Sequence, residues 1–125
     1  MQDLASRIEL LAAGKAVSVF SSTGPRSVQG AQVVAQALGL RPLEREFLGS
    51  RLRGKEAENY PEAADFLEAA GVGSECVVVV TKGEFANRFL AFYGNRKLGA
   101  EFGEVALGRG EAYAIDCEGR TCRPF

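Results

Sequence analysis

Residues 76–94 read Cys-Val-Val-Val-Val-Thr-Lys-Gly-Glu-Phe-Ala-Asn-Arg-Phe-Leu-Ala-Phe-Tyr-Gly, and this stretch decides the fold. Its first five residues, 76–80, are apolar without alternation and mostly β-branched, as in a strand that is covered on both faces. Lys82-Gly83 then forms a sharp turn. After the turn, aromatic residues recur at helical spacing, at Phe85, Phe89 and Phe92. The stretch predicts a buried strand, a tight turn and an amphipathic helix with an aromatic core face.

The turn of this stretch is the predicted site. Ligands of open α/β sheets bind at the carboxyl ends of the strands, where the following helices begin. The first N–H groups of such a helix have no partner within the helix, and its dipole adds a partial positive charge. We therefore expect the functional site beside Lys82 and Gly83.

The length, composition and net charge of the sequence exclude several classes of protein. The 125 residues, of which 46% are hydrophobic, predict a single domain over residues 1–125 with its own core. A net charge of −1 gives no global field to attract nucleic acid or an anionic membrane, so neither is expected as a partner. No apolar run has the length of a membrane span, and the first residues lack the basic and apolar regions of a signal peptide. We expect a cytoplasmic protein.

The chain has three cysteines and no histidine. The odd number, with Cys76 inside the predicted strand, argues against a disulfide framework. Cys117 and Cys122 flank a predicted hairpin loop across which they could face each other, although a reducing compartment disfavours a disulfide there. Their spacing fits no zinc motif, so neither a metal nor a cofactor is expected. The absence of histidine excludes every mechanism that needs an imidazole nucleophile, base or ligand.

The residues before Gly39 predict two helices and a second strand-to-helix turn. Residues 16–20 form a short strand, and Ser-Ser-Thr-Gly-Pro-Arg at 21–26 turns the chain into a helix that stops at Gly39. Arg26 opposes the dipole of this helix by about 0.3–1 kcal/mol, which a bound anion would offset. The first helix is predicted from Asp3 as cap to Gly14 as end, with an inner face of Leu4, Ile8 and Leu11.

The middle of the chain is less regular. Residues 40–47 are compatible with an edge strand, and residues 48–59 are predicted as a loop. This loop is either a cationic lid over the site or an ordinary solvated loop, and its cations are Arg51, Arg53 and Lys55. Tyr60-Pro61 opens a helix that is predicted to end at Gly71, with Phe66 and Leu67 facing inward.

The C-terminal residues complete the pattern. Residues 94–110 are glycine-rich and irregular, residues 111–117 form a last strand, and residues 121–125 are a tail or a short returning strand. Strands alternating with helices predict an α/β fold, a three-layer sandwich with a largely parallel sheet.

Two segments resemble the histidine phosphatase superfamily, which has the phosphoglycerate mutase-like fold. Residues 19–31, Val-Phe-Ser-Ser-Thr-Gly-Pro-Arg-Ser-Val-Gln-Gly-Ala, resemble its Ser-Ser-x-x-x-Arg-x-x-Gln-Thr-Ala segment. Residues 77–85 resemble its strand that ends in Ser/Thr-His-Gly and precedes a helix. The segments 47–61 and 107–115 are compatible with its central insertion and last strand. The resemblance covers nearly the whole chain and implies a single histidine phosphatase-like domain.

The departures from that family change the expected activity. The phosphoryl-accepting histidine of the family lies at the end of a first strand, and this chain begins after that point. Lys82 occupies the position of the second histidine, and a lysine ammonium is a poor nucleophile. The resemblance carries over Arg26 as a phosphate contact with Ser22 beside it, and Gly83 as the glycine of the second motif. Glu84 lies near the place where some members keep a proton donor.

The resemblance also implies a rearranged sheet, because the absent first strand is central in the family. The strands at 17–20 and 77–81 then either pair directly or leave an edge for another chain to fill.

Three functional hypotheses follow from these residues. The first is a non-catalytic domain, a pseudoenzyme, that binds phosphate, a phosphorylated ligand or a protein partner through Arg26, Lys82, Ser22 and Gly83. The second is a phosphatase or mutase with unconventional catalytic residues, in which Glu84 is the acid and Lys82 an electrostatic clamp. The third is an interaction module that pairs with a partner or with itself. Against all three stands the simpler interpretation that Arg26 and Lys82 are solvated surface residues.

Overall fold

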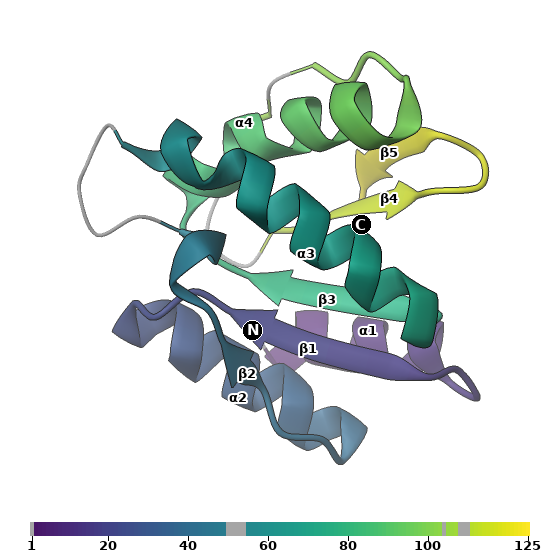
Figure 1. Cartoon of the computed structure of the whole chain (residues 1–125). Coiled ribbons are helices and arrows are strands. Elements are labelled where there is room, and N and C mark those ends of the chain that lie inside the picture. Colours follow the sequence, from purple (N-terminus) through teal and green to yellow (C-terminus); the bar gives the residue numbers. More distant parts are fainter. Residues whose placement is uncertain (1, 50–54, 104, 108–110) are drawn as a thin grey trace.

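The computed structural model describes residues 2–49, 55–103, 105–107 and 111–125. Within these ranges the fold is mixed α/β, with four α-helices around a small parallel sheet and a separate two-stranded hairpin (Figure 1). The elements in chain order are α1 (Gln2–Ala12), β1 (Val17–Ser21), α2 (Pro25–Leu38), β2 (Leu43–Glu44), α3 (Tyr60–Gly73), β3 (Cys76–Val80), α4 (Gly83–Tyr93), β4 (Tyr113–Asp116) and β5 (Thr121–Pro124).

The parallel sheet has the strand order β2-β1-β3. β1 pairs with β3 in parallel from Val17 opposite Cys76 to Ser21 opposite Val80. The two strands therefore pair directly, which is the first of the two arrangements that the resemblance implied. The predicted strand at 76–80 is confirmed, but every one of its residues is half-buried and none is buried. The reason is that β3 lies at the edge of this sheet.

β2 is the opposite edge strand. The edge strand predicted within residues 40–47 is confirmed, although only Leu43 and Glu44 pair with β1. Both residues are exposed, and Arg45 follows with its guanidinium 5.5 Å from the ring centre of Phe66. A strand this short, with a charged residue, offers little edge for further pairing.

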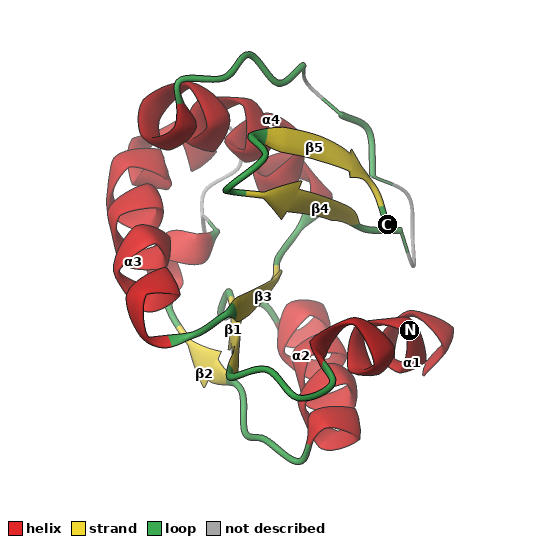
Figure 2. Ribbon diagram, turned by 90° about the vertical axis from the view of Figure 1, so that its right-hand side faces the viewer, coloured by secondary structure: helices red, strands yellow, loops and turns green. Residues whose placement is uncertain are grey.

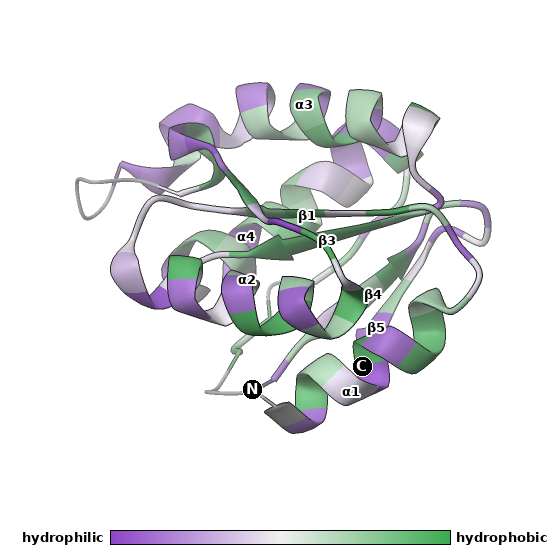
Figure 3. Ribbon diagram, turned by 90° about the horizontal axis from the view of Figure 1, so that it is seen from below, coloured by the Kyte–Doolittle hydropathy of each residue, from purple (hydrophilic) through white to green (hydrophobic). Residues whose placement is uncertain are grey.

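Helices lie on both faces of the sheet (Figure 3). Val78 and Val80 of β3 pack against a cluster from α1 and α2, whereas Val77 and Val79 pack against a cluster from α3 and α4. The alternation of side chains along a strand sends neighbouring valines to opposite faces, so an unbroken run of valines serves both clusters. The larger phosphoglycerate mutase-like sandwich stays a prediction.

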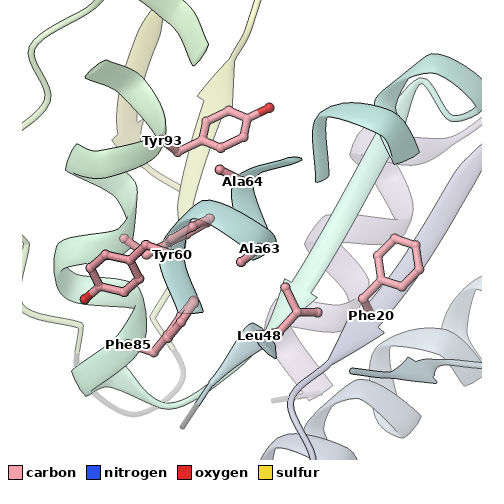
Figure 4. Close-up of a cluster of buried hydrophobic side chains, with 8 residues drawn as sticks. Phe20, Leu48, Tyr60, Ala63, Ala64, Phe85 and Tyr93 are labelled. Atoms are coloured by element: carbon pink, nitrogen blue, oxygen red, sulfur yellow. The ribbon is translucent and has the colours of Figure 1, made fainter. Parts of the chain in front are cut away.

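The α3–α4 cluster is mainly aromatic (Figure 4). Phe85 is 1% exposed and contacts the ring of Tyr60 edge-on, with 5.1 Å between the ring centres. Phe89 stacks on Phe85 at 5.0 Å. The predicted core face of α4 is confirmed at these two positions, but Phe92 is only partly buried and Tyr93 takes the next buried position.

The α1–α2 cluster differs from the prediction at the ends of α1. The helix begins at Gln2, so Asp3 lies in its first turn and is not its cap. Leu11 is 46% exposed, because the buried side of α1 consists instead of Leu4, Ala5, Ile8 and Ala12. Leu4 and Ile8 are buried as predicted.

α2 follows its prediction closely. Pro25 is its first residue and Gly24 its cap, with extended backbone. Gly39 ends the helix in the left-handed conformation, at a φ of 69°, where a residue with a side chain would be strained.

α3 extends beyond its predicted end. It runs through Gly71 to Gly73, and Ser74 is its cap. Gly71 has the ordinary helical conformation and does not end α3. The prediction that the helix ends at Gly71 was therefore wrong. Phe66 and Leu67 pack against the aromatic cluster as predicted.

The predicted loop at 48–59 contains more structure than its sequence indicates. Short 3₁₀ turns cover Glu46–Leu48 and Glu56–Asn59, and Leu48 is fully buried. Lys55 lies 3.7 Å from Glu58 in an exposed ion pair. Arg51 and Arg53 lie outside the described residues.

The C-terminal segment forms its own small sheet (Figure 2). β4 and β5 pair antiparallel with each other, and Ile115 is opposite Cys122. The last strand and the returning strand are therefore confirmed, but neither joins the parallel sheet in the described part of the chain.

Cys117 lies in the turn and does not face Cys122, because the pairing register places Ile115 opposite Cys122. All three cysteines are free thiols. Burial raises the pKa of each thiol.

No helix among the described residues is both long and apolar enough to cross a bilayer.

A salt bridge ties the end of α4 to α3. Residues 94–98 form a π-helical turn, and Lys97 in this turn lies 2.5 Å from the Asp65 carboxylate and 3.3 Å from Glu68. The Lys97 side chain is only 15% exposed. Its hydrogen bond lowers the pKa of Asp65, and the same bond raises the pKa of Lys97.

This pair predicts a loss of stability in acid. Because the folded pKa of Asp65 lies below its unfolded value, the pair stabilises the fold above the unfolded pKa, and this contribution disappears as the pH falls through the folded pKa. Thermal unfolding of the wild type and Asp65→Asn from about pH 7 to about pH 3 tests this. The wild type should be the more stable at neutral pH, and the difference should shrink in acid. Asp3→Asn, which removes the carboxylate of the exposed Asp3–Arg7 pair, is the control; an equal, pH-dependent effect there would contradict the assignment.

Candidate functional site

The candidate site lies at the carboxyl ends of β1 and β3. These ends are level, because Ser21 is paired with Val80 in the register of the two strands. Each strand leads through a short turn into a helix, β1 into α2 and β3 into α4. Two helix N-termini therefore begin side by side at one edge of the sheet, as the sequence predicted.

The N-terminus of α2 has few groups of its own that compete with an anion. Its cap, Gly24, has no side chain, and its first residue, Pro25, has no N–H group. No acidic residue lies in the first turn, which instead contains the exposed Arg26. The N–H groups of Arg26 and Ser27 have no intrahelical partner, whereas that of Val28 donates to the Gly24 carbonyl at 3.0 Å. This end of α2 combines a helix dipole with a full positive charge.

The N-terminus of α4 is different. Its cap is Lys82, whose extended backbone accepts hydrogen bonds from the N–H groups of Phe85 and Ala86 at 3.1 and 3.0 Å. The exposed Glu84 lies in its first turn. A carboxylate at this place already complements the helix dipole, so the end of α4 should attract an anion less than the end of α2 does.

The side chain of Lys82 reaches from one helix end to the other. A Cβ atom built on Gly24 would lie 3.5 Å from the Cε atom of Lys82. The lysine therefore extends from the start of α4 over the cap of α2, two residues before Arg26. Within the described ranges, neither Lys82 nor Arg26 has a carboxylate within 4 Å. Two cations without a carboxylate within 4 Å in the described ranges thus gather at the helix end that lacks an acidic residue.

Ser22 lies beneath this surface and not on it. Its N–H group donates to the Val80 carbonyl at 3.1 Å, and its side chain is buried. Gly49 covers it so closely that a Cβ on Gly49 would lie 2.9 Å from the Cβ of Ser22. The Ser22 hydroxyl has no hydrogen-bond partner among the described residues. The family resemblance implies that Ser22 lies beside the phosphate contact Arg26; the Ser22 side chain is buried, and its role in anion binding stays a prediction.

Two polar side chains that the sequence analysis missed fix Gly49 above Ser22. Thr81 donates its hydroxyl to the Leu48 carbonyl at 2.5 Å, and the Asn59 amide donates to the Gly49 carbonyl at 2.6 Å. The signal for Asn59 was its place before Tyr60-Pro61, where a cap is expected, but its side chain makes no cap bond.

A third missed residue, Asn87, holds the chain beside Gly83. Its backbone carbonyl accepts from the Val105 N–H at 3.0 Å, and its side-chain oxygen accepts from the Leu107 N–H at 2.9 Å. A Cβ on Gly83 would lie 3.6 Å from the Leu107 carbonyl oxygen. Gly83 therefore packs at an ordinary distance against the segment at Leu107. The preceding residue, Lys82, faces the candidate site.

The chemistry available at these turns is electrostatic. No group of three or more histidine, cysteine or acidic residues that could hold a metal occurs in the described ranges. Cys76 lies at the amino end of β3, far along the strand from the site, and burial raises its pKa. Lys82 extends toward α2, and Glu84 belongs to the first turn of α4. Their roles as clamp and acid stay a prediction. Two surface hollows, of about 460 and 310 Å³, lie elsewhere on the molecule.

The chain matches no protein-family model, and neither a curated protein nor a solved structure matches it.

Proposed function

We propose that this protein binds phosphate or a phosphorylated ligand at the N-terminus of α2 and does not hydrolyse it. The observation that carries the proposal is the Lys82 side chain over the cap of α2, with its Cε atom 3.5 Å from the Cβ position of Gly24. Arg26 in the first turn of the same helix adds the second positive charge. An oxyanion there would be stabilised by both side chains and by the N–H groups of the turn.

The resemblance to the histidine phosphatase superfamily supports the same ligand class. Arg26 corresponds to the phosphate-contacting arginine of that family, and Lys82 replaces its second histidine. The proposal is accordingly a degenerate, phosphoglycerate mutase-like domain that keeps the phosphate contacts and has no histidine in its 125 residues. Removing the nucleophile from a catalytic unit can cost on the order of 10⁶ in rate, so binding without turnover is the expected remainder.

A phosphate titration of variants tests the proposal. Lys82→Ala should weaken the binding of inorganic phosphate about tenfold, because about 1.4 kcal/mol is a modest value for one charge-assisted contact. Arg26→Ala should have a similar effect. Arg123→Ala removes the same charge from the exposed part of β5 and should leave the affinity unchanged. Calorimetry or amide chemical shifts provide the readout.

The outcomes separate binding from catalysis. If no binding is detected at millimolar phosphate, or if Arg123→Ala weakens it as much as Lys82→Ala, the site is wrong. A phosphatase assay addresses the enzyme hypothesis, and hydrolysis that is lost in Lys82→Ala would overturn the non-catalytic part of the proposal.

A further inference from the structure

The outer edge of β3 has unpaired backbone groups. On the inner edge, residues that flank β1 bond the Cys76 N–H and the Val80 carbonyl, each at 3.1 Å. Alternate residues of a strand direct their N–H and C=O groups to the same side, so Val78 also faces β1, whereas Val77 and Val79 face away from it. In the part of the chain that the structure describes, nothing pairs with the N–H and C=O groups of Val77 and Val79.

The edge of β4 that faces away from β5 is unpaired in the same way. The Phe125 N–H donates to the Ala112 carbonyl at 2.9 Å, in line with the register of the hairpin. By the same alternation Ala114 bonds β5, and the N–H and C=O groups of Tyr113 and Ile115 point away from it. These groups also have no partner among the described residues. Figures 1 and 2 show β4 between β5 and β3, so its unpaired edge faces that of β3.

The side chains of β4 already alternate between the two clusters on which β3 packs. Ile115 packs against the α3–α4 cluster, as Val77 and Val79 do. Ala112 packs against the α1–α2 cluster, as the alternate valines of β3 do. The two strands run in opposite directions (Figure 1), and antiparallel pairing with Ile115 opposite Val77 keeps these faces. In that register Tyr113 is opposite Val79, and the unpaired groups of the two strands point at each other.

We infer that the β4–β5 hairpin is a strap that closes on β3 and so forms one continuous sheet in the order β2-β1-β3-β4-β5. Unpaired backbone groups at half-buried strand edges cost free energy, and closure satisfies those of both strands at once. Arg7 of α1 donates to the Phe125 carbonyl at 2.8 Å, which tethers the hairpin beside the sheet. A strand from a second chain would compete with a hairpin of the same chain, which has the higher effective concentration. This inference does not depend on the proposed phosphate site.

Amide hydrogen exchange of the full chain tests the closure. The N–H groups of Val77 and Val79 should exchange about tenfold or more slowly than that of Cys122, after correction for intrinsic rates. Cys122 is the matched control, because it lies in β5 opposite Ile115 and its N–H points away from β4.

The register has its own readout. With Ile115 opposite Val77, the residues Val78 and Ala114 form a pair without hydrogen bonds, in which the two Cα atoms approach most closely. A nuclear Overhauser contact between the Hα atoms of Val78 and Ala114 should therefore be present in the wild type.

Two proline variants make the test specific. Tyr113→Pro removes an N–H that faces β3 and leaves the bonds between β4 and β5 in place. The protection of Val77 and Val79 should then be lost, whereas Cys122→Pro, which removes an outward N–H of β5, should preserve it. Continued protection of Val78, which bonds β1, shows that each variant is folded.

Three results would overturn the inference. The first is exchange of Val77 and Val79 in the wild type as fast as that of Cys122. The second is protection that Tyr113→Pro leaves intact or that occurs without the contact between Val78 and Ala114. The third is protection that grows with protein concentration, which would assign the edge of β3 to a second chain.

Discussion

Phe85→Ala is expected to lower the free energy of unfolding by about 3–5 kcal/mol, the usual cost of removing a buried phenylalanine ring. Phe85 is 1% exposed and contacts the rings of both Tyr60 and Phe89, so neighbouring side chains cannot fill the space without losing their own contacts. It is also the third residue of α4, directly after the Lys82-Gly83 turn. Its loss should loosen the helix start on which the candidate site depends.

Urea unfolding with matched variants measures this effect. Phe92→Ala removes the same ring from the same helix, but that ring is only partly buried, and its loss should cost clearly less. Natural domains have a total stability of about 5–15 kcal/mol, so Phe85→Ala should still fold at low temperature but unfold at much lower urea. Equal losses in the two variants would contradict the assignment of Phe85 to the centre of the core.

Gly94→Ala is expected to destabilise the protein by about 1–3 kcal/mol, although alanine is the better helix former by about 1 kcal/mol. Gly94 is buried and has ordinary right-handed backbone, with a φ of −59°, so the substitution causes no backbone strain. The conflict is with Phe102, because a Cβ on Gly94 would lie 2.9 Å from the Cγ atom of that ring. Rotation of the ring about its Cβ–Cγ bond leaves this atom in place, so relief of the contact requires another χ1 rotamer of Phe102 or a shift of the backbone.

Two comparisons make this result specific. Gly71→Ala places the same methyl group inside α3, where nothing lies within 4 Å of it, and should stabilise the protein by about 0.5–1 kcal/mol. Combining Gly94→Ala with Phe102→Leu, which gives a smaller and more flexible side chain, should recover part of the loss. If Gly94→Ala stabilises the protein as Gly71→Ala does, Phe102 does not pack against Gly94 as described.

Local patterns in the sequence were sufficient for the elements of the candidate site. The valine run, the change to helical spacing after Gly83 and the Gly24-Pro25 start of α2 are each determined by neighbouring residues, and each is confirmed. The position of the site at two adjacent strand ends also follows from local signals, because parallel strands with following helices leave little choice of arrangement.

Long-range packing was not predictable in the same way. The half-buried state of β3 depends on which strand lies beside it, and the hairpin at β4 and β5 pairs only with itself in the described residues. Leu48 has no periodic neighbours in sequence, yet it fills a place in the aromatic cluster. The burial of Ser22 results from Gly49, which Asn59 holds in place from ten residues away. Such contacts join segments that are distant in the sequence, and neither segment contains a local pattern that indicates the contact.

The Lys82 side chain over the cap of α2 is the central feature of this account, and a crystal grown in phosphate tests it most directly. An oxyanion should lie within hydrogen-bond distance of the Lys82 ammonium, the Arg26 guanidinium and the N–H groups of the first turn of α2. A well-ordered structure from phosphate-saturated crystals in which Lys82 points into solvent and no anion lies at this helix end would contradict it.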